Sequence, residues 1–415
     1  MVAQGKLITP RTVNGANYNS VWKRAWGLSA WLPFLTQGRV RSPVAYNFGV
    51  SSTTLVDVIS TQIPQLVALV ASGNAKPTHA VIDSITNDIQ PGGGSSTNRT
   101  DVQIKADLVT VWTTLRNMGI VPVQRLNMPR LLSTWTAGNA SRGIQINRWI
   151  TDTAPLYDVV VIDPWAALVD PASTTGQQLA GYFYDGLHPT PTGAYWADRA
   201  LADYFNTLAT RSPYRGYAYS DAFDATSSPT GNLMIRGGIM FGTGGPLVGT
   251  GASGVVADGI TATQSAGGGT SLFSKVARTD GGLGWWQRAV LTGDTTGNCL
   301  RRIALPAGLV AGDKIVATAD TVVSGASGLT SCDFRIGTYD AASGGNLLEE
   351  RRNFATVNYN AADLAMPNAY TGKHVIDDVI TLTGVEQSID VRWSYQTTAG
   401  AAQIDIGAIE VRKVS

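Results

Sequence analysis

Residues 185–196 read DGLHPTPTGAYW, and this stretch carries the strongest indication of fold and function in the chain. Asp185 stands three residues before His188, and a carboxylate so close to an imidazole can fix its tautomer and stabilise its charged form during proton transfer. The stretch follows an apolar run at 158–162 and leads into a helical pattern at 194–208. It is therefore predicted to connect the last strand and the last helix of a domain. The alternative is that Asp185 only caps a loop.

Strand-like and helix-like segments alternate upstream of this stretch. Apolar runs typical of buried strands lie at 44–50, 80–85, 120–126 and 158–162. A helical pattern opens near Asp101, taken as its N-cap, and ends before Gly119. Strands that alternate with helices form a parallel sheet covered on both faces, with the functional site at the carboxyl ends of the strands. We therefore predict a three-layer α/β/α sandwich over residues 1–208.

The amino-acid composition of the chain changes after residue 208. Residues 209–216 are predicted to be a linker, and residues 217–415 are rich in Gly, Ser and Thr with short β-branched stretches. Many short strands separated by Gly-rich turns predict an all-β sandwich or jelly-roll. Because no constellation of reactive side chains is visible there, this second domain is expected to serve binding or assembly.

Composition excludes several classes of protein. A hydrophobic content of 44% with 15% charged residues is typical of a folded chain. A net charge of +1 gives no electrostatic reason to expect nucleic acid or an anionic membrane surface as a partner. No run approaches the roughly 18 apolar residues of a membrane span. The first ten residues also lack the pattern of a signal peptide.

Histidine and cysteine are scarce, which narrows the chemistry. Of the three histidines, His79 and His374 lie in apolar or β-rich surroundings and are expected to be structural. Cys299 and Cys332 are the two cysteines; two buried thiols are favoured over a disulfide, and the pairing stays open. No cluster has the spacing of a metal site, and no cofactor is expected.

Three blocks, in order, resemble the SGNH/GDSL hydrolase superfamily. Asp185 and His188 match its last block, Asp-x-x-His before the terminal helix. NFGVS at 47–51 matches the block that carries an oxyanion-hole glycine, which would be Gly49, and TND at 86–88 matches the block whose asparagine would be Asn87. The resemblance implies a serine esterase in which His188 is general base and acid and Asp185 orients it. Gly49 and Asn87 would then donate to the carbonyl oxygen, which such groups stabilise by about 3 kcal/mol each. For Asn87 and the aspartate after it, the alternative is a turn or a helix cap.

The sequence departs from the family at the nucleophile. The segment GKLIT at 5–9 stands where the family has Gly-Asp-Ser, with Lys6 at the aspartate position and Leu7 at the serine position, and Ile85 replaces a glycine of the third block. Leucine has no nucleophilic atom, so covalent acyl transfer at this position is impossible. The chain is then a natural pseudoenzyme or a deliberately altered enzyme, or the alignment of this block with the family is wrong. Hydroxyls that could substitute, each with an ordinary turn or cap role, are those of Thr9, Ser51, Ser52 and Ser84.

The second domain resembles the carbohydrate-binding jelly-rolls appended to secreted or phage-borne esterases. Trp285 and Trp286 could offer an aromatic platform to a sugar ring, or one could be core and the other a surface residue. Two functions follow as expectations. The first is a polysaccharide O-acetyl esterase scaffold that is inactive as written. The second is a non-catalytic glycan-binding virion protein of a tail or head fibre.

Both functions imply an acetylated glycan or another polysaccharide as partner. A homo-oligomer such as a trimer, or a virion protein, is a possible further partner. The expected location is the virion or the cell exterior, reached without a signal peptide on this chain. An intracellular lipase or thioesterase in the cytoplasm is the weaker alternative, because such enzymes rarely carry a β-sandwich.

Overall fold

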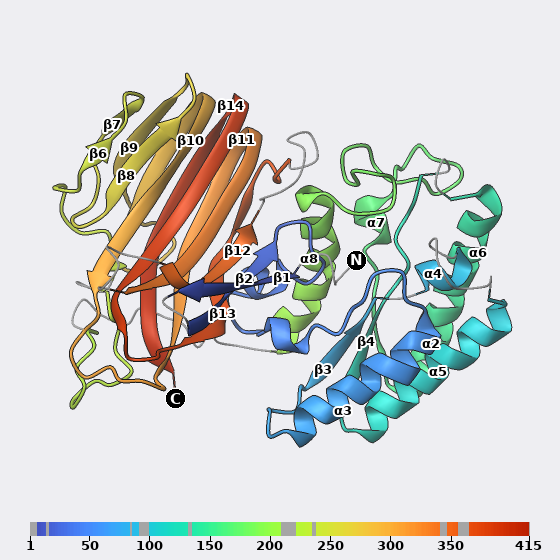
Figure 1. Ribbon diagram of the computed structural model, residues 1–415. Coiled ribbons are helices and arrows are strands. Elements are labelled where there is room, and N and C mark those ends of the chain that lie inside the picture. Colours follow the sequence, from blue (N-terminus) through green and yellow to red (C-terminus); the bar gives the residue numbers. More distant parts are fainter. Residues whose placement is uncertain are drawn as a thin grey trace. The chain divides into compact units, whose positions relative to one another are not determined.

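The computed structural model describes residues 6–13, 16–83, 85–90, 99–131, 135–208, 221–234, 238–340, 347–355 and 365–414. The chain divides into two compact units, and we describe each by itself (Figure 1). The α/β unit spans Ala45–Tyr204, and the all-β unit joins Lys6–Val44 to Phe205–Ser415. Residues 6–44 cluster with the C-terminal half, whereas the predicted first domain ran from residue 1 to residue 208. The predicted linker at 209–216 lies outside the described residues.

The α/β unit is built on a parallel sheet in the order β3 (His79–Ile82), β4 (Val121–Arg125) and β5 (Val160–Ile162). In Figure 1, α8 lies on one side of this sheet and α5 on the other. The parallel α/β class predicted from the alternating pattern is therefore confirmed. The helices of this unit are α2 (Leu55–Asp57), the π-helical turn η3 (Val58–Gln62), α3 (Ile63–Ala71), α4 (Thr86–Ile89), α5 (Asp101–Asn117), α6 (Ala137–Thr153), η4 (Ala154–Tyr157), α7 (Trp165–Leu168) and α8 (Pro191–Leu208).

Helix α5 shows how the sequence sets these elements. Thr100, one residue before the predicted cap, is the N-cap, and its hydroxyl accepts a hydrogen bond from the backbone N–H of Gln103. The helix ends before Gly119, whose φ of 70° favours glycine. Its apolar stripe is fully inside the unit; Ile104, Leu108, Val111, Trp112 and Leu115 are buried in the main hydrophobic cluster. Among the described residues, no helix has both the length and the apolar character needed to cross a membrane.

The strand predicted at residues 44–50 is wrong. Residues 44–50 form the 3-10 helix η2 (Val44–Tyr46) followed by an irregular loop. Their polar groups bind locally or to side chains, as when Gly49 N–H donates to Asn47 Oδ1 at 3.1 Å, so no neighbouring strand is needed. Residues 6–13 do form a strand, β1 (Lys6–Val13), but it pairs antiparallel with β2 (Ala16–Arg24) in the all-β unit.

The all-β unit contains a large sheet whose main path runs β1-β2-β12-β11-β14-β10-β8-β6, with β13, β9 and β7 attached to it. Its longest strands, β10, β11 and β14, pair antiparallel with several register shifts. Such breaks let one strand bend and pair with different neighbours along its length. The bounds are β6 (Leu247–Val248), β7 (Ala252–Gly254), β8 (Thr261–Ala266), β9 (Thr270–Ala277), β10 (Trp285–Ala304), β11 (Lys314–Asp340), β12 (Leu347–Ala355), β13 (Tyr370–Thr381) and β14 (Glu386–Val414), with one short helix, α1 (Leu32–Leu35).

The core of the all-β unit confirms the structural roles predicted for its histidine and thiols. His374 is buried against the rings of Phe34, Phe334 and Phe354, and burial lowers its pKa to about 3, so it is neutral. Cys299 and Cys332 are buried and free. Burial raises the pKa of Cys332 to about 12, which makes an unreactive thiol.

Candidate active site

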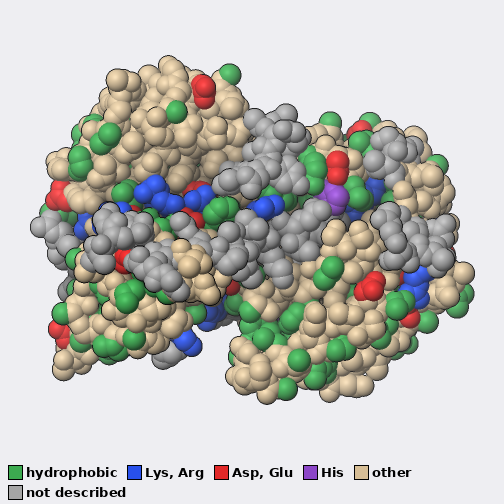
Figure 2. All heavy atoms as spheres, viewed as in Figure 1, with side chains coloured by type: hydrophobic (Ala, Val, Ile, Leu, Met, Phe, Trp, Pro, Cys, Tyr) green, Lys and Arg blue, Asp and Glu red, His purple; other side chains and the backbone are tan. Residues whose placement is uncertain are grey.

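The predicted pair of Asp185 and His188 is formed. His188 Nδ1 lies 2.6 Å from Asp185 Oδ2, and the side chains are 20% and 41% exposed, so the pair is reachable from solvent. Figure 2 shows histidine atoms at the surface of the face drawn, with acidic side-chain atoms beside them. With Nδ1 donating to the carboxylate, Nε2 is the atom that can accept a proton from a nucleophile. This is the geometry that a general base requires.

The loop around the pair is fixed by its own backbone. Asp185 Oδ1 accepts hydrogen bonds from the backbone N–H groups of Leu187 and His188, at 2.9 and 2.6 Å. Tyr184 N–H donates to the carbonyl of His188, and the two rings stack with centroids 5.6 Å apart. Burial acts to raise the pKa of Asp185, but the hydrogen bonds from His188 and Leu187 outweigh it and lower that pKa. Asp185 is therefore a carboxylate at neutral pH.

A buried arginine that sequence analysis missed joins this loop to the third block. Arg130 is 3% exposed; it donates to Thr86 Oγ1 at 2.8 Å and to the carbonyl oxygen of Leu187. Burial lowers the pKa of Arg130 to about 10, and the charges of Asp83 and Asp185 oppose this, so the guanidinium stays protonated at neutral pH. Because Thr86 precedes Asn87 and Leu187 precedes His188, the two blocks converge at the carboxyl edge of the sheet. In the sequence, Arg130 is an arginine five residues after β4. Nothing in the sequence distinguishes such an arginine from one at the surface.

The third block begins with a strained residue. Ile85 has φ +82° and ψ −23°, a left-handed conformation that β-branched residues avoid. The SGNH/GDSL pattern has glycine at this position, and the backbone here has kept the conformation that glycine favours. Ile85 is only 1% exposed, so its burial in the core compensates the strain. The turn it makes presents Thr86 and Asn87 at the start of α4.

The loop that contains Gly49 is hydrogen-bonded to α4, which carries Asn87, and both expected oxyanion donors make protein contacts. Asn87 Nδ2 donates to the carbonyl of Thr53 at 2.8 Å, and Asp88 accepts from the backbone N–H of Leu55. Residues 47–55 are thereby tied to α4, which brings the Gly49 loop to Asn87. One amide hydrogen of Asn87 can still go to a ligand, whereas Gly49 N–H would have to exchange its bond to Asn47 for a bond to substrate.

Leu7, the predicted nucleophile position, belongs to the all-β unit. Leu7 lies in β1, opposite Trp22, and its side chain is outside the described residues. The assignment of Leu7 to the serine position stays a prediction from the order of the blocks. Of the substitute hydroxyls, Ser51 and Ser52 lie in an exposed turn, Thr9 lies in β1, and Ser84 is outside the described residues.

The two tryptophans of the all-β unit have separate environments. Trp285 is 43% exposed, with Lys275 Nζ 5.1 Å from its ring. Trp286 is 6% exposed and lies under the guanidinium of Arg278, 4.0 Å from the ring centroid. Only Trp285 can therefore offer a face to a ligand, and Trp286 belongs to the core.

Comparison with known proteins places these observations in a family. Residues 13–196 match the model of the GDSL-like lipase/acylhydrolase family, a range that begins after Leu7. No curated protein matches the chain. A GDSL-like lipase from Bacteroides thetaiotaomicron is 16% identical, with 39% of this chain and 75% of that chain covered and a TM-score of 0.32.

Two other solved structures cover similar shares of the chain. The enzymatically active domain of tailspike protein 4 from bacteriophage CBA120 is 11% identical, with 38% of this chain and 20% of that chain covered and a TM-score of 0.26. A xylan-binding carbohydrate-binding module from Paenibacillus barcinonensis is 16% identical, with 38% and 86% covered and a TM-score of 0.24. The family match covers the Asp185–His188 pair, so residues 13–196 are similar to the GDSL-like lipase/acylhydrolase family.

Proposed function

We propose that the chain is a GDSL-type ester-hydrolase scaffold directed at an acetylated polysaccharide. The observation that carries the proposal is the 2.6 Å contact between His188 Nδ1 and Asp185 Oδ2, held by backbone hydrogen bonds at the carboxyl edge of the parallel sheet. Ester hydrolysis needs a base that takes a proton from the nucleophile and returns it to the leaving alcohol, and an oriented imidazole does both. Asn87, and Gly49 after its exchange, would stabilise the charge on the carbonyl oxygen.

The nucleophile decides how active this scaffold is. With Leu7 at the serine position, the remaining groups give only modest catalysis, so we expect hydrolysis of p-nitrophenyl acetate near background. The double variant Lys6→Asp with Leu7→Ser should then gain activity that depends on His188. Leu7→Ser alone should gain less, because a cation near the imidazole lowers its basicity.

The opposite result would come from a serine inside the family match. Ser20, Ser29 and Ser42 are the serines between residue 13 and residue 44. Ser29 lies in the turn between β2 and α1 with φ +70°, an unusual conformation for serine. If the unaltered protein hydrolyses the ester well and Ser29→Ala abolishes this while Ser42→Ala does not, Leu7 does not occupy the serine position and the protein is an active enzyme.

The second candidate is a non-catalytic glycan-binding protein of a virion. The exposed Trp285, with the Lys275 ammonium beside its ring, favours it, because an aromatic face is what a binding module offers to a sugar. Binding of an acetylated polysaccharide with no hydrolysis by the unaltered protein or by the double variant would support this candidate. We place either protein in the virion or outside the cell, rather than in the cytoplasm, because its proposed ligand is found there.

A further inference from the structure

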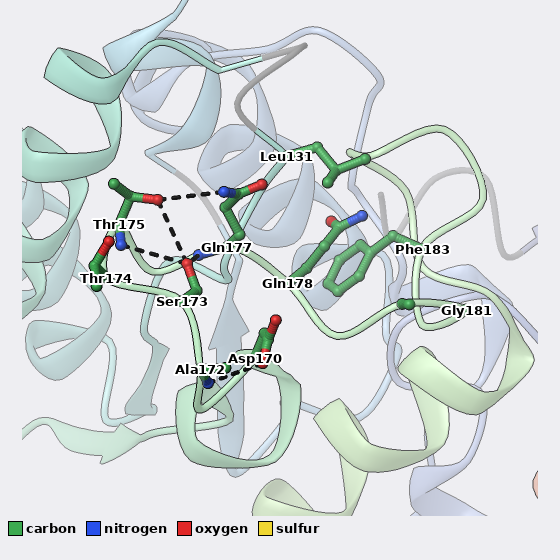
Figure 3. Close-up of a pocket in the computed structure, with 11 residues that line it drawn as sticks. Leu131, Asp170, Ala172, Ser173, Thr174, Thr175, Gln177, Gln178, Gly181 and Phe183 are labelled. Carbon is green, nitrogen blue, oxygen red and sulfur yellow. Dashed lines mark hydrogen bonds between the residues drawn. The ribbon is translucent and has the colours of Figure 1, made fainter.

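A cavity of about 570 Å³ lies beside the His188 loop, and none of the roles above uses it. Its wall is the segment from Asp170 to Phe183, between α7 and α8, together with Leu131 (Figure 3). The volume is within the range of about 300–1,000 Å³ that small-molecule sites have. We propose that this cavity binds one uncharged pyranose ring of a polysaccharide, next to the residue that carries the ester.

The chemistry of the wall selects this class of ligand. It presents the hydroxyls of Ser173, Thr174 and Thr175 and the amides of two glutamines, over an apolar surface that includes Phe183. Hydroxyls and amides both donate and accept, as the hydroxyls of a neutral sugar do. A fatty acyl chain would leave these groups unpaired, which disfavours a lipid.

Charge excludes acidic sugars and phosphates. Asp170 lines the cavity, and among the described lining residues there is no Lys or Arg. One carboxylate oxygen, Oδ1, accepts from the backbone N–H of Ala172 at 2.9 Å. A uronate or phosphate ligand would therefore face a negative charge without a cation to compensate it.

A buried acceptor without a partner points to a missing ligand. Gln178 is 7% exposed, lines the cavity, and its Oε1 has no hydrogen-bond partner in the described structure. Such an atom destabilises the fold unless something donates a hydrogen bond to it. Figure 3 shows the Gln178 amide reaching into the space between Leu131 and the Ser173–Gln177 side. A sugar hydroxyl that donates to Oε1 would remove this cost.

The wall is rigid enough to act as a preformed site. Ser173 Oγ accepts from the backbone N–H groups of Gln177 and Thr175, at 2.9 and 3.3 Å. Gln178 is held by a β-bridge to Val169 at the base of the loop. These contacts fix the polar groups before a ligand binds, which lowers the entropy cost of binding.

The cavity also shares backbone with the catalytic loop. Phe183 forms a β-bridge with Pro189, on the other side of Asp185 and His188, and Leu131 N–H donates to the carbonyl of Gly186 at 3.2 Å. A ring bound in the cavity would hold the next sugar of the same polysaccharide near His188. This step rests on the proposed function, whereas sugar binding in the cavity does not.

The experiment measures binding of simple sugars to the full chain by saturation-transfer NMR. The probes are the methyl glycosides of glucose, galactose, mannose, xylose, rhamnose and N-acetylglucosamine, with galacturonate as the acidic probe and glycerol as the polyol control. We expect at least one neutral glycoside to bind, and Gln178→Ala to weaken it about tenfold, the loss of one hydrogen bond. Gln145→Ala, an exposed glutamine on α6, is the matched control and should bind like the unaltered protein.

A second variant covers a folding failure of the first. Asp170→Asn keeps an oxygen for Ala172 N–H but removes the charge, so galacturonate should then bind within a few-fold of the neutral glycoside. The proposal is overturned if no neutral glycoside binds, if Gln178→Ala and Gln145→Ala bind alike, or if galacturonate binds the unaltered protein as well as the neutral glycosides do. The p-nitrophenyl acetate assay contains no sugar, so the proposed ester chemistry and this site can fail independently.

Discussion

The two units use polar side chains in opposite ways. In the all-β unit, charged groups pair across neighbouring strands, as Arg288 does with Asp405 and Arg302 with Asp390, and both carboxylates are at most 6% exposed. In the α/β unit, polar side chains of loops bind backbone N–H groups of the same loop, as Asp185 does with Leu187 N–H. The cross-strand pairs occupy both carboxylate oxygens of Asp405 and of Asp390 within the sheet. Loop contacts instead hold a reactive side chain in position, as the contact of Asp185 with His188 Nδ1 does.

The largest test of this comparison is loss of the proton-transfer base. In the Lys6→Asp and Leu7→Ser variant, His188→Ala should lower kcat/KM for p-nitrophenyl acetate about 1,000-fold, because no other group would take the proton of the serine. His79→Ala, which removes a histidine of β3, is the control and should change kcat/KM little. Equal losses in both variants would show that the effect is structural.

The tryptophans test whether the all-β unit separates core from binding surface. Trp286→Ala should lower the free energy of unfolding by about 3–5 kcal/mol, because it empties a buried site. Trp285→Ala should change stability by less than about 1 kcal/mol and weaken depletion of the protein by an insoluble acetylated polysaccharide. Urea unfolding and the depletion assay measure the two effects. Unchanged depletion by Trp285→Ala would remove the glycan-binding role of this residue.

Removal of residues 213–415 tests whether the all-β unit serves glycan binding or assembly of the protein. Most of its strands lie beyond that point, but β1 and β2 would lose their partner β12. We therefore compare the full chain with a shortened chain of residues 45–208. The shortened chain is used only if it unfolds in a cooperative transition. Light scattering should show a smaller oligomer only if the all-β unit assembles the protein, and an unchanged monomer would discard that role.

Arg130 tests whether a buried cation positions the loops of the α/β unit. Arg130→Met should cost about 3 kcal/mol of unfolding free energy, because it leaves Thr86 Oγ1 and the carbonyl of Leu187 without the guanidinium and removes a buried charge near Asp83. Arg116→Met removes an exposed pair with Asp158, whose carboxylate is 76% exposed, and should cost less than about 1 kcal/mol. A similar cost for both would mean that burial of the arginine has no special role.

Ile85 tests the strain at the third block. Ile85→Ala and Ile85→Gly both remove a buried side chain, but only glycine adopts φ +82° without strain. The glycine variant should therefore be about 1 kcal/mol more stable than the alanine variant, the reverse of their order in an ordinary core strand. Thermal unfolding of the two variants measures the difference, and a more stable alanine variant would contradict the strained conformation.

The smallest expected effect is a pH dependence at Asp185. Its pKa is lower in the folded protein, so its hydrogen bonds stabilise the fold above about pH 4 and are lost as the carboxylate is protonated. Asp185→Asn should cost less than about 1 kcal/mol at pH 7, because the group is partly exposed and screened. The difference between unaltered protein and variant should shrink as the pH falls below about 4. A constant difference from pH 3 to pH 7 would contradict the shift.

Sequence patterns predicted the functional loop better than the boundaries of the units. Asp185 and His188 lie three residues apart, so their contact depends on one local loop. The strand predicted at 44–50 failed because Asn47 and its neighbours satisfy their backbone groups within the loop, which an apolar pattern does not show. The clustering of residues 6–44 with the second unit could not be predicted for another reason. Strand β2 pairs with β12, more than 300 residues away, and such pairing has no local signal in the sequence.

The sequence by itself determined the α/β class, the all-β second half, the helix stripe of α5 and the pairing of His188 with Asp185. Each depends on periodicity or short spacing, which side-chain burial and local hydrogen bonds translate directly into structure. Only the tertiary structure decided that β1 and β2 join the second unit, that Trp285 is exposed while Trp286 is buried, and that Arg130 links Thr86 to the His188 loop. These depend on contacts between residues distant in sequence, where burial and register are set by the partner segment and not by the residues themselves.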